Sequence, residues 1–172
     1  PTSKPYMVNL YFHGDYVPTP SAGCLNVQYI RLQRESAAEH ITIAELEAYV
    51  GPLNVALRRP TSTSGWVNYP DKNINDGCWR SSNGVPGCIA HTSTTAIGNY
   101  FEIDLQKEWC LDRIYVRFYT QAMHRINGIV GTVLDSSRVE VGRKDYSEFG
   151  NDATKYQPSV MWYFGPNRTG AR

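Results

Sequence analysis

The feature of this 172-residue chain that most restricts its fold is the shortness of its apolar runs. These runs are rich in β-branched and aromatic residues, and Gly, Pro, Asn, Asp or Ser interrupts them every few positions. In VQYIRLQ, for example, apolar and polar side chains alternate as they do in a half-buried strand. Extended runs are predicted at residues 7–12, 27–33, 100–105, 111–119, 131–134, 138–141 and 159–164. Short strands bounded by turns predict an all-β fold, an antiparallel β-sandwich or jelly roll.

The size and charge of the chain narrow its organisation and its partners. A length of 172 residues suits one hydrophobic core, so residues 1–172 are predicted to form a single domain. The formal net charge is +1 and there is no long basic run, which argues against nucleic acid or an anionic membrane as partner. No apolar stretch approaches the roughly 20 residues of a membrane span, so membrane insertion is not expected.

Residues 41–50 are ambiguous in their local preference. The segment AELEA favours a helix, although the apolar residues of the same stretch also alternate as in a strand. Local sequence alone favours the helix. From residue 60 to about residue 98, Pro, Ser, Thr, Asn and Gly predict a region dominated by loops.

The four cysteines permit three complete pairings. They are Cys24, Cys78, Cys88 and Cys110, and none forms a close C-x-x-C pair that would indicate zinc or redox chemistry. Cys78 and Cys88 bracket a short loop rich in Ser, Gly and Pro, which favours a disulfide between them. The alternative is four buried thiols, if the protein folds in a reducing compartment.

Several motifs resemble a known family when they are taken in order. They are NVALRRPT at residues 54–61, NINDG at 73–77, YFEIDL at 100–105, RING at 125–128 and VLDS at 133–136. Their order and spacing resemble the discoidin or coagulation-factor C-type domains and the F-type lectins (fucolectins) that share their fold. The resemblance covers about residues 27–141. It implies a discoidin-like, galactose-binding-domain-like jelly roll with carbohydrate binding as its ancestral activity.

One segment departs from the order of that family. Residues 27–33 and 41–49 resemble the last two strands of the family, yet here they precede its first motif. A circularly permuted domain explains this order, with residues 27–50 equivalent to the last strands and residues 53–172 to the first part. The alternative is a fragment cut out of phase from tandem repeats, which the faint likeness of residues 7–12 to residues 161–164 favours. In either case we expect residues 27–50 to pair within the same sandwich.

The resemblance to F-type lectins also implies a sugar site. These lectins bind fucose hydroxyls through a His, an Arg-x-Asp motif and a second basic residue. His91 and Arg125 match the first and last of these positions, whereas Phe118 and Thr120 occupy the Arg and Asp positions. One interpretation is an altered sugar pocket in which His91 and Arg125 donate hydrogen bonds beside Phe118. The other is a structural role, a loop hydrogen bond for His91 and an ion pair for Arg125.

A structural calcium ion is a second implication of the resemblance. Many family members bind Ca²⁺ through an Asn-x-x-Asp-Gly loop and a Glu of the last strand, and Asn73, Asp76 and Glu45 match these positions. Ser81 offers a further oxygen ligand. Against calcium, Cys78 replaces the usual Asn of the loop. An Asx turn at Asp76 explains the same residues without a metal.

Two classes of function follow from this sequence. The first is a glycan-binding module of an extracellular or surface protein. The second is a structural interaction domain that packs against neighbouring proteins in a coat, such as the surface of an alga or the capsid of a large virus. Both classes imply an extracellular, cell-surface or virion location. Because no nucleophile elbow, His-rich metal motif or phosphate loop is present, the chain is not expected to be an enzyme. Loop residues 73–88 and 120–125 are expected to converge at the ligand-binding end.

Overall fold

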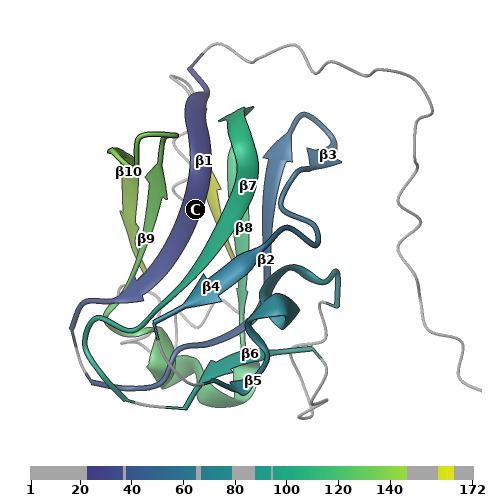
Figure 1. Ribbon diagram of the computed structural model, residues 1–172. Helices are drawn as coiled ribbons and strands as arrows, with labels where there is room; N and C mark the ends of the chain where they lie inside the picture. Colours follow the sequence, from purple (N-terminus) through teal and green to yellow (C-terminus); the bar gives the residue numbers. More distant parts are fainter. Residues whose placement is uncertain are drawn as a thin grey trace, which may run out of the picture.

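The computed structural model describes residues 23–36, 38–64, 67–78, 88–93, 95–146 and 159–164, which form two open antiparallel β-sheets (Figure 1). The first sheet has the order β10 (Glu140–Asp145), β9 (Ile129–Leu134), β1 (Leu25–Arg34), β7 (Tyr100–Leu111), β4 (Thr61–Thr63). The second has the order β11 (Ser159–Tyr163), β8 (Arg113–Phe118), β2 (Thr42–Val50), β6 (Ala90–Thr92), β5 (Val67–Tyr69), and β3 (Leu53–Asn54) pairs with β2. The predicted all-β sandwich is therefore confirmed.

The hydrophobic core lies between the two sheets. In Figure 1 the first sheet faces the viewer, with β8 and the yellow strand β11 behind it. Alternate residues of the strands point inward, as the burial pattern of β8 shows, and aliphatic and aromatic side chains from both sheets form one cluster. Its most buried members include Ile30, Leu32, Leu46, Phe101, Ile103, Leu105, Val116 and Phe118, each 1% exposed or less.

Residues 27–50 are integral to both sheets. Strand β1 lies between β7 and β9, with Ile30 opposite Ile103 on one side and Val133 on the other. Strand β2 lies between β8 and β6 in the second sheet. The expected pairing of this segment is thus confirmed, whereas the helix that local preference favoured at residues 41–50 is wrong. Pairing and burial on both faces of β2 outweigh a weak local propensity.

The remaining segments deviate from the predicted boundaries in small ways. The region from residue 60 to residue 98 contains three short strands and the 3₁₀ helix η1 (Asp71–Asn75), as well as loops. The predicted strand at 138–141 begins later, as β10, because a turn at residues 135–138 precedes it. A second 3₁₀ helix, η2 (Thr120–Ile126), follows β8. The predicted strand at 7–12 lies outside the described residues.

Two disulfides join cysteines, one pair close in the sequence and the other far apart. Cys78 is bonded to Cys88, as predicted, across a sequence separation of 10 residues. Cys24 is bonded to Cys110 across 86 residues, which ties the start of β1 to the end of β7. Such bonds are typical of an oxidising environment. Neither of the helices in the described part of the chain is long and apolar enough to cross a membrane.

The two disulfides should differ in their contribution to stability. Replacing Cys24 and Cys110 by Ser should lower the free energy of unfolding by about 2 kcal/mol more than replacing Cys78 and Cys88, because the longer loop loses more entropy in the unfolded chain. Guanidinium unfolding followed by Trp fluorescence measures both variants. Equal losses, or a larger loss for the Cys78–Cys88 variant, would contradict the loop-entropy explanation.

Candidate functional site

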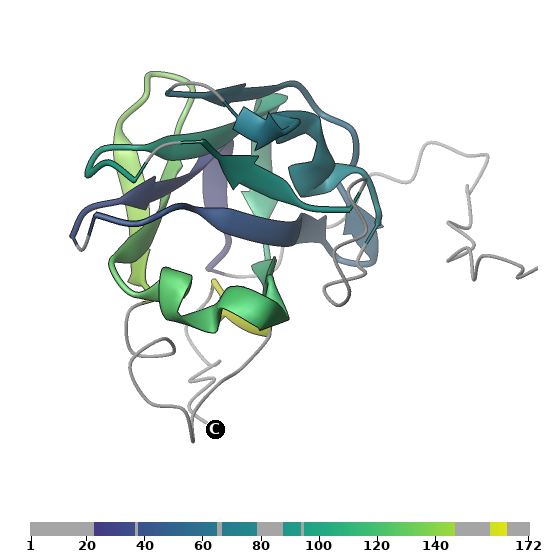
Figure 2. The same ribbon diagram turned by 90° about the horizontal axis from the view of Figure 1, so that it is seen from below.

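Three segments meet at one end of the sandwich, which Figure 2 shows from below with η2 in green. Strand β6 pairs with the start of β2, so that His91 lies opposite Thr42. Arg125 lies in the helix η2 at the same end of the sandwich, and its guanidinium contacts Thr42. The segment from Arg34 to Thr42 connects β1 to β2 and completes this end of the molecule.

The hydroxyl of Thr42 joins the two predicted ligand-binding residues. Arg125 Nη1 donates a hydrogen bond to Thr42 Oγ1 at 3.1 Å, and Thr42 Oγ1 lies 2.8 Å from His91 Nδ1. Since the guanidinium can only donate, the arrangement that uses every hydrogen has the Thr42 hydroxyl donating to His91 Nδ1. The proton of the neutral imidazole then lies on Nε2. No hydrogen bond joins Nε2 to another of the described residues.

The surroundings of His91 keep its ring uncharged. The side chain is 9% exposed, its ring centroid lies 4.7 Å from that of His40, and Tyr69 approaches edge-on at 6.1 Å. Burial, and then the charges of His40 and Arg125, lower the pKa of His91 to about 4. At neutral pH, His91 is therefore a neutral hydrogen-bonding group and carries no positive charge.

Glu39 supplies an acceptor beside these donors. Its Oε1 lies 3.6 Å from Arg125 Nε, and the two side chains are 32% and 26% exposed. The backbone N–H of His40 donates to the same carboxylate at 2.8 Å, and this bond, followed by the charge of Arg125, lowers the pKa of Glu39. The site thus combines a cationic donor, a neutral donor and an ionised acceptor within one small area.

A fully buried arginine holds these segments together. The Arg34 side chain is 0% exposed and donates hydrogen bonds to the carbonyls of His40 at 2.6 Å, Arg125 at 2.5 Å, and Asn127. Burial lowers its pKa to about 10, which still leaves it charged at neutral pH. A β-carbon at Gly128 would lie 2.0 Å from the carbonyl oxygen of Ser36. Only glycine permits this close approach of the turn after η2.

Phe118 and Thr120, the other two residues predicted at the sugar site, lie apart from this network. Phe118 is 1% exposed and packs edge-to-face on Tyr146, with ring centroids 5.5 Å apart. It is a core residue in the structure, and its ring offers no surface to a ligand. Thr120 begins η2 and is exposed. Of the four predicted residues, the structure brings His91 and Arg125 together.

Three contributing residues were missed by the sequence analysis. Glu39 and His40 lie in the connection between β1 and β2, and Thr42 is the first residue of β2. The resemblance offered no template for that connection. The usable signal was the polar Glu39-His40 pair directly before an apolar strand, at the same end as the short strand β6 that carries His91.

The residues predicted to bind calcium form a second cluster. The Glu45 carboxylate is 0% exposed and accepts a hydrogen bond from Gly77 N, at 3.3 Å to Oε1 and 3.2 Å to Oε2. Asp76 Oδ1 accepts from Cys78 N at 2.7 Å, which is the Asx turn of the metal-free interpretation. Asn73 is buried and its amide donates to the carbonyl of Ile89 at 2.9 Å. Ser81 lies outside the described residues.

The electrostatics of this cluster favour a cation. Burial, and then the neighbouring carboxylates of Asp76 and Glu47, raise the pKa of Glu45 to about 9. Burial also raises the pKa of Asp76. In the described part of the chain no three His, Cys, Asp or Glu side chains converge, so carbonyl or water oxygens would have to complete a calcium site. Carboxylate oxygens are ligands that Ca²⁺ prefers, and two adjacent carboxylates, one of them fully buried, are present here.

The comparisons with known proteins identify no relative. No protein-family model matches the chain. No curated protein and no solved structure matches it either.

Glu45 should make the metal-free protein less stable as the pH rises. Its pKa is higher in the folded than in the unfolded protein, so its contribution is favourable below pH 4.5, declines as the pH rises, and levels off above about pH 9. The slope for one proton is at most about 1.4 kcal/mol per pH unit. In EDTA, urea unfolding of Glu45→Gln should lack most of this decline.

Glu140→Gln is the matched control, because Glu140 is exposed at the edge strand β10. This variant should keep the pH dependence of the unchanged protein. If Glu45→Gln shows the same decline as the unchanged chain, the buried carboxyl is already ionised at pH 5 and the assignment is wrong.

Proposed function

We propose that this protein is a non-enzymatic, glycan-binding module that recognises sugar hydroxyls at the His91–Thr42–Arg125 network. The observation that carries the proposal is the shared hydrogen bonding of His91 and Arg125 to one hydroxyl. Side chains from two strands and a 3₁₀ helix are thereby held together, with Glu39 beside them. Hydroxyl groups of a sugar both donate and accept, so a site with His91 Nε2–H, Arg125 and the Glu39 carboxylate complements them.

The altered motif predicts modest affinity and a changed specificity. Phe118 and Thr120 replace the Arg and Asp of the fucose motif, and Phe118 is in the core. Each charge-assisted hydrogen bond lost costs about 1.5–3 kcal/mol of binding energy. Glu39 supplies a carboxylate from a different segment. We therefore expect weak or absent binding to free fucose, and preference for another neutral sugar.

An extracellular, cell-surface or virion location accords with this proposal. Two disulfides are stable in an oxidising environment, and glycans are abundant there. The sandwich fold by itself does not distinguish binding from assembly. The location is therefore part of the proposal, and it rests on the disulfides and on the chemistry of the site together.

One observation favours the second class of function, a structural domain of a coat assembly. His91 is 9% exposed, and Arg125 is engaged by both Thr42 and Glu39. Such a network can serve only to fix η2 against β2 and β6, while neighbouring coat proteins bind elsewhere on the sandwich. In that case removal of His91 would lower stability and leave every interaction with glycans unchanged.

We also propose that a structural Ca²⁺ ion is held by Glu45 and Asp76, with Asn73 close by. The ion would offset the repulsion between two neighbouring carboxylates, of which Glu45 is fully buried. It would also anchor the Asp76-Gly77 turn to β2, because Gly77 N already donates to Glu45. The role would be to stabilise the start of the loop closed by the Cys78–Cys88 disulfide.

The glycan-binding proposal is tested by variants on a glycan array and by calorimetry with the glycans retained. His91→Ala and Arg125→Ala should each weaken binding by about tenfold or more, because each removes a donor to the sugar. Glu140→Gln and Arg143→Ala, two exposed sites on β10, should bind as the unchanged chain does. Circular dichroism verifies that all four variants are folded. If the folded His91→Ala and Arg125→Ala variants still bind, the glycan site is not here. If the unchanged chain binds no glycan on the array, the structural coat domain is favoured.

Calcium binding is tested by thermal unfolding at pH 8 with Ca²⁺ or with EDTA. Ca²⁺ should raise the melting temperature of the unchanged protein, because an ion that binds only the folded state stabilises it. Glu45→Gln should show a much smaller rise, and Mg²⁺ at the same concentration should be less effective. If Ca²⁺ raises the melting temperature of Glu45→Gln equally, the ion binds elsewhere. If Ca²⁺ does not raise the melting temperature of the unchanged protein, the Asx turn alone explains Asp76.

A further inference from the structure

A pocket of about 240 Å³ opens on the outer face of the first sheet, away from the His91–Arg125 network. The strand register explains its lining. Tyr29 of β1 lies opposite Asp104 of β7, and Ser62 of the edge strand β4 lies opposite Glu102 of β7. Arg138, in the turn between β9 and β10, reaches the same pocket. We call it the Asp104 pocket.

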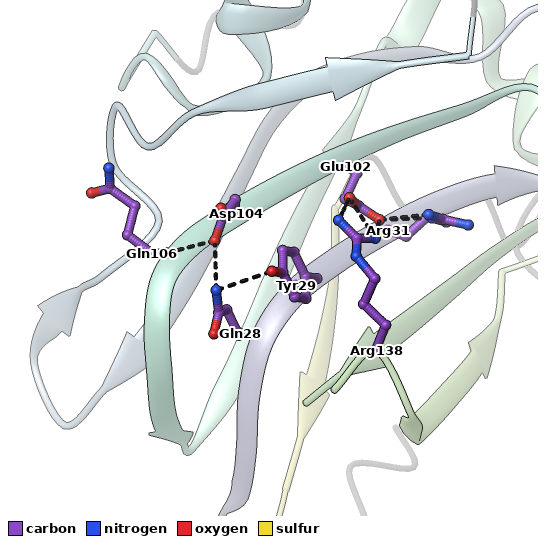
Figure 3. Close-up of polar contacts among 7 residues, drawn as sticks. All are labelled: Gln28, Tyr29, Arg31, Glu102, Asp104, Gln106 and Arg138. Atoms are coloured by element: carbon purple, nitrogen blue, oxygen red, sulfur yellow. Dashed lines mark hydrogen bonds and ion pairs between the residues drawn. The ribbon is translucent and has the colours of Figure 1, made fainter. Parts of the chain in front are cut away.

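One wall of the Asp104 pocket is a carboxylate clamped by two arginines (Figure 3). Glu102 is 5% exposed, and its Oε2 accepts from Arg31 Nε at 2.9 Å and Nη2 at 2.7 Å. Its Oε1 accepts from Arg138 Nη1 at 3.2 Å and Nη2 at 3.1 Å. Each guanidinium also lies over an aromatic ring, Arg31 over Tyr100 at 4.4 Å and Arg138 over Tyr29 at 4.0 Å. These contacts fix the charged groups before any ligand arrives.

The opposite side of the pocket retains unused hydrogen-bonding capacity. Asp104 Oδ1 accepts from Gln28 Nε2 at 3.3 Å and from Gln106 N at 2.7 Å. Within the described residues, the second oxygen of Asp104 has no hydrogen-bond donor. Gln28 Nε2 also donates to the Tyr29 hydroxyl at 3.1 Å, which leaves the hydroxyl hydrogen of Tyr29 free to donate. An acceptor and a donor therefore lie side by side, as Figure 3 shows.

Two strained residues flank this arrangement. Three non-glycine residues in the described part of the chain have positive φ, and Gln106 at 68° and Arg138 at 64° are two of them. The left-handed conformation costs such a residue roughly 1–2 kcal/mol. Here it directs Gln106 N to Asp104 and Arg138 to Glu102. Strain of this kind is concentrated at binding sites, because the arrangement it maintains has a function.

The balance of charge and size selects the ligand. Among the residues that line the pocket, Arg138, Glu102 and Asp104 have a formal charge of −1 in total. Arg31, which lies outside the lining and pairs with Glu102, offsets this charge, so the pocket has little net charge to attract an ion. Its volume is below the roughly 300–1,000 Å³ of pockets for drug-sized ligands, which limits it to one small ring. We propose that the Asp104 pocket binds one uncharged sugar ring, whose hydroxyls donate to Asp104 and accept from Tyr29, Arg138 and Ser62. This second site goes beyond the proposed function and is independent of His91 and Arg125.

The test is a titration of the isotope-labelled chain with the methyl glycosides of D-galactose, D-glucose, D-mannose and L-fucose. The amide NMR chemical shifts are measured at each step. At least one glycoside should bind in the millimolar range and shift the amides of Tyr29, Ser62, Asp104 and Gln106. Asp104→Asn should weaken this binding about tenfold, since it removes the charge of the acceptor. Ser62→Trp, at an exposed position on the edge strand, should abolish it by filling the pocket.

Two controls separate this proposal from the one for His91 and Arg125. Glu140→Gln, on the same sheet but outside the pocket, should bind as the unchanged chain does. The double variant His91→Ala/Arg125→Ala should keep the shifts at Tyr29 and Asp104. If none of the four glycosides shifts these amides, or if Ser62→Trp binds as well as the unchanged chain, the Asp104 pocket is not a sugar site. Shifts lost in the double variant and kept in Ser62→Trp would overturn this proposal while supporting the other.

Discussion

The arrangement at the end of the sandwich that holds His91 and Arg125 depends on the buried guanidinium of Arg34. Arg34 is the last residue of β1, the middle strand of the first sheet. Its guanidinium donates to the carbonyls of His40, Arg125 and Asn127. A buried charge is costly unless its hydrogen bonds are made, so those three carbonyls must occupy fixed places around it. The segment before β2 and the helix η2 are positioned by the same side chain. The geometry of the candidate site therefore depends on a residue that is itself fully buried.

The fold was predictable because the pattern that determines it is local. In β8 every second residue is buried, and the alternating side chains that produce this pattern are visible in the sequence. The segment at residues 42–50 was harder, since AELEA is a good helix sequence when considered alone. It becomes a strand because β8 and β6 provide partners on both sides. That information lies far away in the chain, and only the resemblance to a family pointed towards it.

The candidate site was only partly predictable, for a related reason. His91 and Arg125 could be singled out by a motif, and the structure brings them to one hydroxyl. Thr42 and Glu39 could not, because their roles depend on how the start of β2 and the segment before it pack against β6 and η2. Nothing in the sequence marks Arg34 as a buried residue. For Phe118 the motif was misleading. Its place in a motif suggested a ligand contact, whereas the inward phase of β8 directs its ring into the core. No single motif marks the Asp104 pocket, because it is assembled by the register of β1, β4 and β7 together with the turn that carries Arg138.

The Cys24–Cys110 bond has a mechanical consequence. Tension applied along the chain passes from Cys24 directly to Cys110 through a covalent link, so the residues between them carry almost none of the load. Glu39, Thr42 and His91 lie within this shielded segment, and so do Tyr29, Ser62 and Asp104. Arg125 and Arg138 lie outside it. Under a pulling force Arg125 and Arg138 would therefore be displaced first, while Arg31 and the other residues of the two sites stayed in place.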